Sequence, residues 1–472
     1  MIWLYVGGLA CALGLACVLG FGRSNAAGIT TSRWGRLMRL WLSTVRLVGR
    51  RMLHAVHGVF VGEEKRRALD KARAEAAGKE VLQTMGNMKG ALMKLGQIVS
   101  FMDDTLPPEL QAELRKLQAS APPMPYELVE SVIRLELGQA PELAFAELEQ
   151  QAMAAASIGQ VHRAVLPDGT RVAVKVQYPG VDRAIQADLS NYGLLMGAIN
   201  LMTPTLDAKP IVDELTARLS EELDYQREAD NVELFRGLYE GHPQIVVPRV
   251  FRAASSRRVL TTELLEGLPF YEFVEKGSDA DKRSAVETLH TFCFESLYQH
   301  HVFNGDPHPG NYLFLPGGRV GFLDFGCVKR FPPEFLAAFR QMNRLYLLQD
   351  RAAFYAQAVK MRFVLPNQTD KVDPDWLYDY LRYYYLPILH DREFLFTADY
   401  CKRAVGVMFG PNMRRLNMPA DFVMLNRITF GLNSIFAQLG ARANWHRLAR
   451  RQYFEPGDAE RWEANPPHPE MA

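Results

Sequence analysis

The chain has 472 residues, with 54 Lys or Arg against 53 Asp or Glu, and its formal net charge at pH 7 is +1. This length accommodates two lobes and additional segments, and the even charge balance gives no indication of a nucleic-acid partner. The five cysteines are scattered and form no C-x-x-C pair, which excludes a disulfide framework or a zinc site of the usual spacing and fits a reducing compartment.

The first predicted element, residues 1–24, is a membrane anchor. Residues 2–22 form an uncharged apolar run long enough to cross a bilayer. Residues 23–62 contain seven arginines and no acidic residue, so the positive-inside rule places the rest of the chain on the cytoplasmic side, or on the matrix or stromal side of an organelle. A cleaved signal peptide is the alternative, although it would need a positive n-region and a shorter apolar core. A stripe of small residues in this run is compatible with pairing of two spans into a homodimer, but such residues are common in spans.

Residues 25–78 are predicted to form a basic, membrane-proximal segment. Within it, residues 33–53 place apolar side chains at steps of three and four, opposite a row of arginines. This pattern is typical of a helix that lies on an anionic membrane leaflet. Leu40 and Leu47 lie near the polar face, which leaves open that the helix packs on the body of the protein instead.

Residues 79–145 are predicted to be a mainly helical extension, and residues 146–266 the smaller lobe of a two-lobed domain. In that lobe Ala154–Val161 has the spacing of the phosphate-binding loop G-x-G-x-x-G-x-V, with alanine at the first two glycine positions. A strand, a turn and then V-A-V-K at Val172–Lys175 follow in the order expected of a kinase. The lysine needs a carboxylate partner, and Glu228, on a helix predicted over residues 211–235, is the candidate.

Residues 267–455 are predicted to form the larger lobe, with the reaction chemistry near its start. Asp306 and Asn311 stand in the spacing D-x-x-x-x-N after a predicted helix, and Asp324 opens D-F-G after a predicted hairpin. In protein kinases the first Asp orients the nucleophile, and the Asn and second Asp hold magnesium. The remainder of this lobe reads as helical, with tyrosines 383–385 favouring a core. Residues 456–472 are predicted to be a disordered tail.

These motifs together resemble the UbiB/AarF family of atypical, kinase-like proteins. The resemblance covers about residues 80 to 450. It rests on six motifs: K-x-G-Q at Lys94–Gln97, A-A-A-S at Ala154–Ser157, V-A-V-K-V-Q at Val172–Gln177, E-x-D at Glu222–Asp224, D-P-H-P-G-N at Asp306–Asn311 and D-F-G at Asp324–Gly326. K-x-G-Q combined with the alanine-rich loop is highly specific to this family.

The resemblance implies an α+β, two-lobed protein-kinase-like fold with a helical N-terminal extension, in addition to the predicted transmembrane helix. It also implies binding of ATP and Mg²⁺, association with a membrane, and a place in ubiquinone or other isoprenoid-lipid metabolism. Implied partners are therefore membrane lipid, an isoprenoid or quinone precursor and lipid-biosynthesis proteins.

Roles for individual residues follow from the same resemblance. Lys175 and Asp306 take the catalytic positions, and Asn311 and Asp324 the metal positions. The nucleotide-binding residues are Ala154, Ala155, Ala156, Ser157, Lys175, Glu228 and Glu263, the last directly before a predicted hinge at Leu264–Gly267. The residues of a lid over the active site are Lys94, Gln97, Glu222 and Asp224. Two positions depart from the family pattern: Asn304 stands where His is commoner, and Gly159 where Ala is commoner.

Three functions remain open from the sequence. One is a membrane-anchored kinase-like enzyme or ATPase, and another is a nucleotide-sensing scaffold for a lipid or quinone biosynthesis complex. The third, an ordinary protein kinase, is disfavoured because only residues 327–331 separate D-F-G from Pro332, which leaves no evident platform for a peptide.

Overall fold

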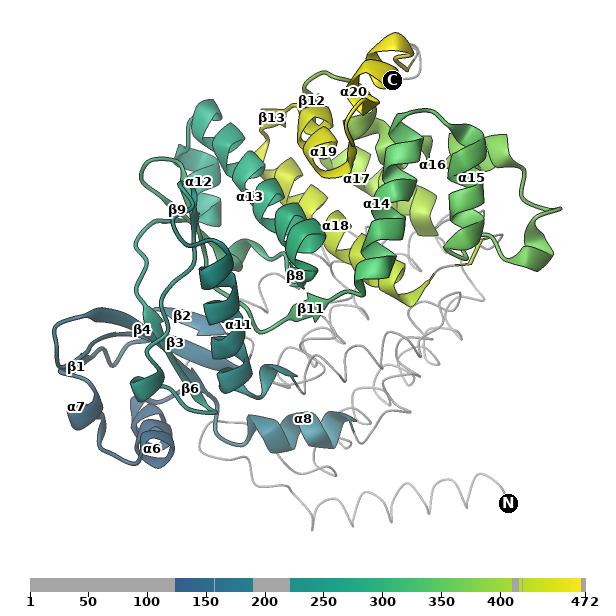
Figure 1. The fold of residues 1–472 in the computed structure, drawn as a ribbon. Coiled ribbons are helices and arrows are strands. Elements are labelled where there is room, and N and C mark those ends of the chain that lie inside the picture. Colours follow the sequence, from purple (N-terminus) through teal and green to yellow (C-terminus); the bar gives the residue numbers. More distant parts are fainter. Residues whose placement is uncertain (1–123, 157, 190–220, 410–415, 418, 468–472) are drawn as a thin grey trace, which may run out of the picture. The chain divides into compact units, whose positions relative to one another are not determined.

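The computed structural model describes residues 124–156, 158–189, 221–409, 416–417 and 419–467 (Figure 1). The predicted anchor, the basic segment and most of the helical extension, with Lys94 and Gln97, lie outside these ranges, as does Ser157. No helix among the described residues is both long and apolar enough to be a membrane span.

The chain divides into two compact units. The first runs to Ala229 and resumes for Val250–Leu264, and the second comprises Asp230–Arg249 and the chain from Leu265 onward. The boundary after Leu264 falls at the predicted hinge. The stretch Asp230–Arg249, which the sequence assigned to the smaller lobe, belongs to the second unit instead.

The first unit is built on an antiparallel sheet of order β1-β3-β4-β6, with β2 paired to β3. Its strands are β1 (Glu147–Leu148), β2 (Ala154–Ala156), β3 (Gly159–Val165), β4 (Arg171–Gln177) and β6 (Val259–Glu263), and its helices include α6 (Tyr126–Leu137), α7 (Pro141–Ala144) and α8 (Val181–Leu189). Along β4, Val172, Val174 and Val176 are buried while Ala173 and Lys175 are only partly covered. Side chains alternate between the faces of a strand, so the valines anchor β4 in the core and Lys175 projects from the opposite face.

The departure at Gly159 has a packing reason in this chain. A Cβ atom at Gly159 would lie 2.2 Å from the carbonyl oxygen of Val176 on the neighbouring strand. No side chain fits at that distance, so the glycine allows β3 and β4 to approach closely directly after the β2–β3 turn.

The second unit begins within helix α11 (Tyr225–Leu238) and contains a four-stranded sheet of order β5-β10-β9-β7. Its strands are β5 (Ile245–Val246), β7 (Leu268–Pro269), β9 (Tyr312–Leu315) and β10 (Arg319–Phe322). Helices α12 (Phe270–Lys276) and α13 (Asp279–His300) precede a two-stranded ribbon of β8 (Val302–Asn304) and β11 (Val328–Arg330). A capping box of Ser278 and Asp281 begins α13, and strand β8 connects the end of this helix to the Asp306 loop.

A body of helices completes the second unit (Figure 1). It contains α14 (Pro333–Leu347), α15 (Arg351–Lys360), α16 (Pro374–Leu389), α17 (Ala398–Phe409), α18 (Ala420–Leu439), α19 (Trp445–Tyr453) and α20 (Asp458–Ala464), with a short ribbon of β12 (Phe394–Leu395) and β13 (Arg442–Ala443). The predicted helical character after Asp324 is confirmed.

The prediction of a disordered tail from residue 456 is wrong for the part that forms α20. Asp458 and Trp462 are buried, and the Arg344 guanidinium binds the Asp458 carboxylate through both its Nε and its Nη2. Burial alone would raise the pKa of Asp458, but hydrogen bonds from Arg344 and the Glu455 amide lower it below the ordinary value. The tail composition suggested disorder, whereas this long-range ion pair fixes the helix.

Candidate active site

In the first unit, Lys175 and Glu228 form an ion pair, as the sequence predicted. Lys175 Nζ donates to Glu228 Oε1 at 2.7 Å and to Oε2 at 2.9 Å. The carboxylate is 4% exposed and the lysine 17% exposed. The Tyr225 ring lies 5.0 Å from the same ammonium group, a cation–π distance. The lysine is thus held at a defined position on β4.

Helix α11 presents Glu228 because of its burial pattern. Tyr225, Ala229, Val232 and Phe235 are buried and recur at three- and four-residue steps. Glu228 belongs to this stripe, so it faces inward and not into solvent. Glu221 and Glu222 precede α11 and do not belong to this stripe.

Asp224 has a local structural role. Its Oδ1 accepts a hydrogen bond from the Gln226 amide at 3.0 Å, which stabilises the first turn of α11. Glu222 lies beside it, half-buried. The pairing of these two acids with Lys94 and Gln97 in a lid stays a prediction, because the latter two lie outside the described residues.

The alanine-rich stretch forms strand β2 of a hairpin with β3. Ala154, Ala155 and Ala156 pair with Val161, Gln160 and Gly159, respectively, and the first two alanines are exposed. This is the hairpin expected of a phosphate-binding loop. Glu263 is exposed at the end of β6, one residue before the unit boundary.

In the second unit, a network of hydrogen bonds shapes the Asp306 loop. Asn311 Nδ2 donates to the Asp306 carbonyl at 2.9 Å, and the His308 amide donates to the same oxygen at 2.8 Å. The Asn311 carbonyl accepts from the Leu323 amide at 3.0 Å. Because the β9–β10 hairpin returns the chain to this point, Asn311 and Asp324 come from neighbouring segments although they are distant in the sequence.

The D-F-G turn is held by two asparagines. Asn304 Nδ2 donates to the Asp324 carbonyl at 2.8 Å, and Asn231 Nδ2 donates to the Phe325 carbonyl at 2.9 Å. The Gly326 amide in turn donates to Asp324 Oδ1 at 2.9 Å. Asn304, which stands where His is commoner in the family, therefore contacts the Asp324 backbone. Sequence reasoning missed Asn231, although its place three residues after Glu228 on one helix could have suggested it.

The Phe325 side chain anchors the turn in the core. It is fully buried, with its ring centroid 5.0 Å from that of Phe235 and 6.4 Å from that of Phe292. The next residues form β11, which pairs with β8, and α14 begins at Pro333. The described chain after D-F-G therefore leads directly into the helical body without an extended loop.

The donor set around Asn311 and Asp324 fits magnesium. Mg²⁺ prefers hard oxygen ligands, keeps several waters and is commonly held by one or two protein groups with substrate phosphates. Asn311 uses its Nδ2 as a donor to the loop, which orients its amide oxygen, and the Asp324 carboxylate is held by the Gly326 amide. Among the described residues, no group of three or more His, Cys, Asp or Glu side chains is placed to hold a metal ion.

A lysine–glutamate pair on a strand and helix, an Asp–Asn loop, a hairpin and a D-F-G turn, in this chain order, define a protein-kinase-like fold. More narrowly, the chain belongs to the ABC1 atypical kinase-like family, because the sequence model of the ABC1 atypical kinase-like domain matches residues 116–358. This confirms the resemblance that the sequence motifs indicated.

Several known proteins are similar to this chain. Atypical kinase COQ8, mitochondrial, of Saccharomyces cerevisiae is 30% identical over 378 residues, which cover 78% of this chain and 74% of the yeast protein. Atypical kinase COQ8B, mitochondrial, of Danio rerio is 31% identical over 62% of this chain and 47% of its own length. Protein ACTIVITY OF BC1 COMPLEX KINASE 3, chloroplastic, of Arabidopsis thaliana is 36% identical over 51% of this chain and 35% of its own length.

A solved structure supports the fold. The complex of Rv3197 with erythromycin from Mycobacterium tuberculosis superposes with a TM-score of 0.63 at 30% identity, covering 83% of this chain and 100% of that one.

Proposed function

We propose that this chain is a membrane-anchored atypical kinase or ATPase that binds Mg²⁺ and ATP and supports ubiquinone or other isoprenoid-lipid metabolism. The observation that carries the proposal is the Lys175–Glu228 ion pair, at 2.7 Å, in a chain that also holds its D-F-G turn by two asparagine side chains. The lysine–glutamate pair and the D-F-G aspartate must both be in place in an active kinase.

Each residue then has a defined task. Lys175 binds the α- and β-phosphates, and Glu228 keeps its ammonium group in position. Asn311 and Asp324 would hold Mg²⁺, which would supply positive charge to the phosphate oxygens. Asp306 orients the attacking nucleophile and accepts its proton.

The parts around these residues limit what can react. The hairpin that begins at Ala154 covers the phosphates, and the chain after Glu263 meets adenine. We further propose that Lys94 and Gln97 close over the site with Glu222 and Asp224. The short link between Phe325 and α14 offers no platform for a peptide, which disfavours phosphorylation of generic protein substrates.

The proposed setting is a membrane surface. Residues 1–24 would anchor the chain and residues 25–78 would contact an anionic leaflet, with the kinase-like domain on the side that contains ATP. Relatives carry the words mitochondrial or chloroplastic in their names, so the matrix or stromal side of an organelle membrane is one proposed location. An isoprenoid or quinone precursor is the proposed substrate class.

The test is ATP turnover by the full chain in lipid nanodiscs, with Mg²⁺ titrated and products identified by mass spectrometry. Lys175→Ala and Asp324→Asn should each abolish Mg²⁺-dependent turnover, because electrostatic positioning of this kind contributes about 3–4 kcal/mol to catalysis. Turnover at the wild-type level in both variants would refute the assigned roles. Tight Mg²⁺–ATP binding without turnover in the wild type would support the nucleotide-sensing scaffold instead.

A further inference from the structure

A cavity of about 80 Å³ lies in the helical body of the second unit, lined by residues of α13, α14, α16, α18 and α19. Aromatic rings form much of its wall. The rings of Phe396, Phe436 and Trp445 have centroids 4.6 to 5.7 Å apart. One water needs about 10–15 Å³ on this scale, so the cavity accommodates about six water-sized groups, the size of one six-membered ring.

The wall of the cavity is uncharged. No Asp, Glu, Lys or Arg side chain lines it. Its one histidine, His290, is neutral at pH 7, because burial and the nearby charge of Arg451 lower its pKa to about 3. A charged ligand would lose its hydration without gaining a counter-ion, so the occupant must be neutral.

One residue in the wall has a buried N–H donor without a hydrogen-bond partner among the described residues. Asn343 is 2% exposed, and its Oδ1 accepts from the Tyr385 hydroxyl at 2.7 Å. Its Nδ2 has no hydrogen-bond partner among the described residues. Because a buried N–H group without a partner is costly, this atom favours an occupant with an accepting oxygen.

The Thr429 hydroxyl in this wall is already paired. It donates to the Leu425 carbonyl at 2.9 Å. Pro387 in α16 cannot bond the carbonyl of Tyr383, and the Tyr400 hydroxyl donates to that carbonyl at 3.0 Å instead. Among the lining residues, Asn343 is the one with a fully buried side-chain atom that has no hydrogen-bond partner in the described part of the chain.

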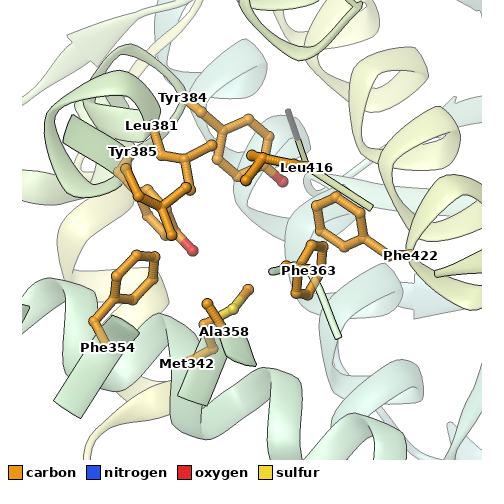
Figure 2. Close-up of a pocket in the computed structure, with 10 residues that line it drawn as sticks. Met342, Phe354, Ala358, Phe363, Leu381, Tyr384, Tyr385, Leu416 and Phe422 are labelled. Atoms are coloured by element: carbon orange, nitrogen blue, oxygen red, sulfur yellow. The ribbon is translucent and has the colours of Figure 1, made fainter. Parts of the chain in front are cut away.

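A smaller neighbouring cavity shows the contrast. It measures about 20 Å³ and shares Tyr384 and Tyr385 with the larger one (Figure 2). Apart from those two tyrosines its lining is apolar, with Met342, Phe354 and Phe422 among the side chains around it. Its size suits a single water at most, so the larger cavity is the candidate for a ligand.

We propose that the larger cavity is a binding site for a small, neutral, ring-containing molecule whose carbonyl or ether oxygen accepts from Asn343 Nδ2. The wall helices also touch the Asp306 loop. A Cβ at Gly431 on α18 would lie 2.6 Å from Pro307 Cγ, and Ile428 lies near Gly305. Binding in the cavity should consequently slow amide exchange in residues 305–311, a readout that does not depend on the proposed function.

Cyclohexanone is a suitable probe, with methylcyclohexane as its matched apolar analogue. We would measure binding to the full chain in nanodiscs by calorimetry. The wild type should bind both. Asn343→Leu should weaken the binding of cyclohexanone by about 3- to 10-fold, which is the contribution of one hydrogen bond. It should leave the binding of methylcyclohexane unchanged. Ala449→Leu, which fills the cavity, should abolish binding of both.

Thr429→Val is the control, since it removes a polar group from the same wall that is already paired. It should leave cyclohexanone binding unchanged. Cyclohexanone binding that survives Ala449→Leu would overturn the proposal, and so would equal weakening of both probes by Asn343→Leu. Failure of cyclohexanone to bind, with water on Asn343 Nδ2 in a crystal structure, would establish a hydrated cavity only.

Discussion

Lys175 in the first unit and Asp324 in the second are both fixed by neighbours, but the neighbours differ in kind. Lys175 is held by an opposite charge, the Glu228 carboxylate, which is 4% exposed. Asp324 is held by neutral groups: Asn304 donates to its carbonyl, Asn231 donates to the next carbonyl, and the Gly326 amide donates to its carboxylate. The first arrangement fixes a side chain with an opposite charge, whereas the second fixes the D-F-G turn with neutral hydrogen-bonding groups.

This difference predicts different consequences when a partner is lost. Removing one member of a buried ion pair leaves the other as an uncompensated charge. Removing a neutral amide leaves a carbonyl without one hydrogen bond, which is a smaller loss. Predictions at the ion pair and at the D-F-G turn test this comparison, and one at the buried His290 adds the case of a side chain that is buried in its neutral form.

The largest effect is expected at the ion pair. Lys175→Met should destabilise β4 and α11 by about 3–5 kcal/mol, because it breaks a buried ion pair in which both Glu228 carboxylate oxygens accept from the lysine. The double variant Lys175→Met/Glu228→Gln should recover most of this loss. Hydrogen exchange of the β4 and α11 amides measures the local stability of the single and the double variant. Nucleotide binding should be lost in both variants. Equal destabilisation of the single and double variants would show that charge pairing does not hold this lysine.

An intermediate effect on stability is expected when the pH is lowered, because of His290 in the second unit. The folded-state pKa of His290 is lowered to about 3, whereas an unfolded histidine has a pKa near 6.5. Between these values the unfolded chain binds more protons, so stability falls as the pH falls below about 6.5. Lowering the pH from 6.5 to 5 should therefore reduce the free energy of unfolding by about 2 kcal/mol.

The measurement is urea unfolding of the wild type and of His290→Phe at both pH values. His446 in the same unit also has a pKa lowered by burial, so the wild type should retain a second acid-sensitive contribution. His290→Phe should therefore reduce the pH dependence without removing it. An unchanged slope would show that His290 is protonated in the folded chain.

The smallest effect on stability is expected at the D-F-G turn. Asn304→Ala or Asn231→Ala should each cost about 1 kcal/mol, while turnover falls and the Mg²⁺ concentration needed for half-maximal turnover rises, because Asp324 is less well positioned. Asn304→His keeps a donor and should restore the metal dependence. Asn367→Ala, at an exposed turn, is the control. If Asn304→Ala destabilises the second unit without changing its metal dependence, the role of Asn304 is structural only.

Sequence alone predicted the features that depend on short spacings. The V-A-V-K motif after a turn placed Lys175 on a strand, and two apolar runs around a Pro-Gly-Gly turn predicted the β9–β10 hairpin. The helix predicted before the Asp306 loop is α13, with the short strand β8 between them. Each depends on residues within one or two elements, where periodicity and turn chemistry dominate.

Tertiary structure decided the contacts between residues far apart in the chain. Asn231 meets Phe325 across 94 positions, and Arg344 meets Asp458 across 114, which turns an apparently disordered tail into a buried helix. The neutral cavity beside Asn343 likewise exists only because five helices converge there. No local pattern encodes such contacts, because they are set by the path of the whole chain and by which buried polar groups that path brings within hydrogen-bond distance.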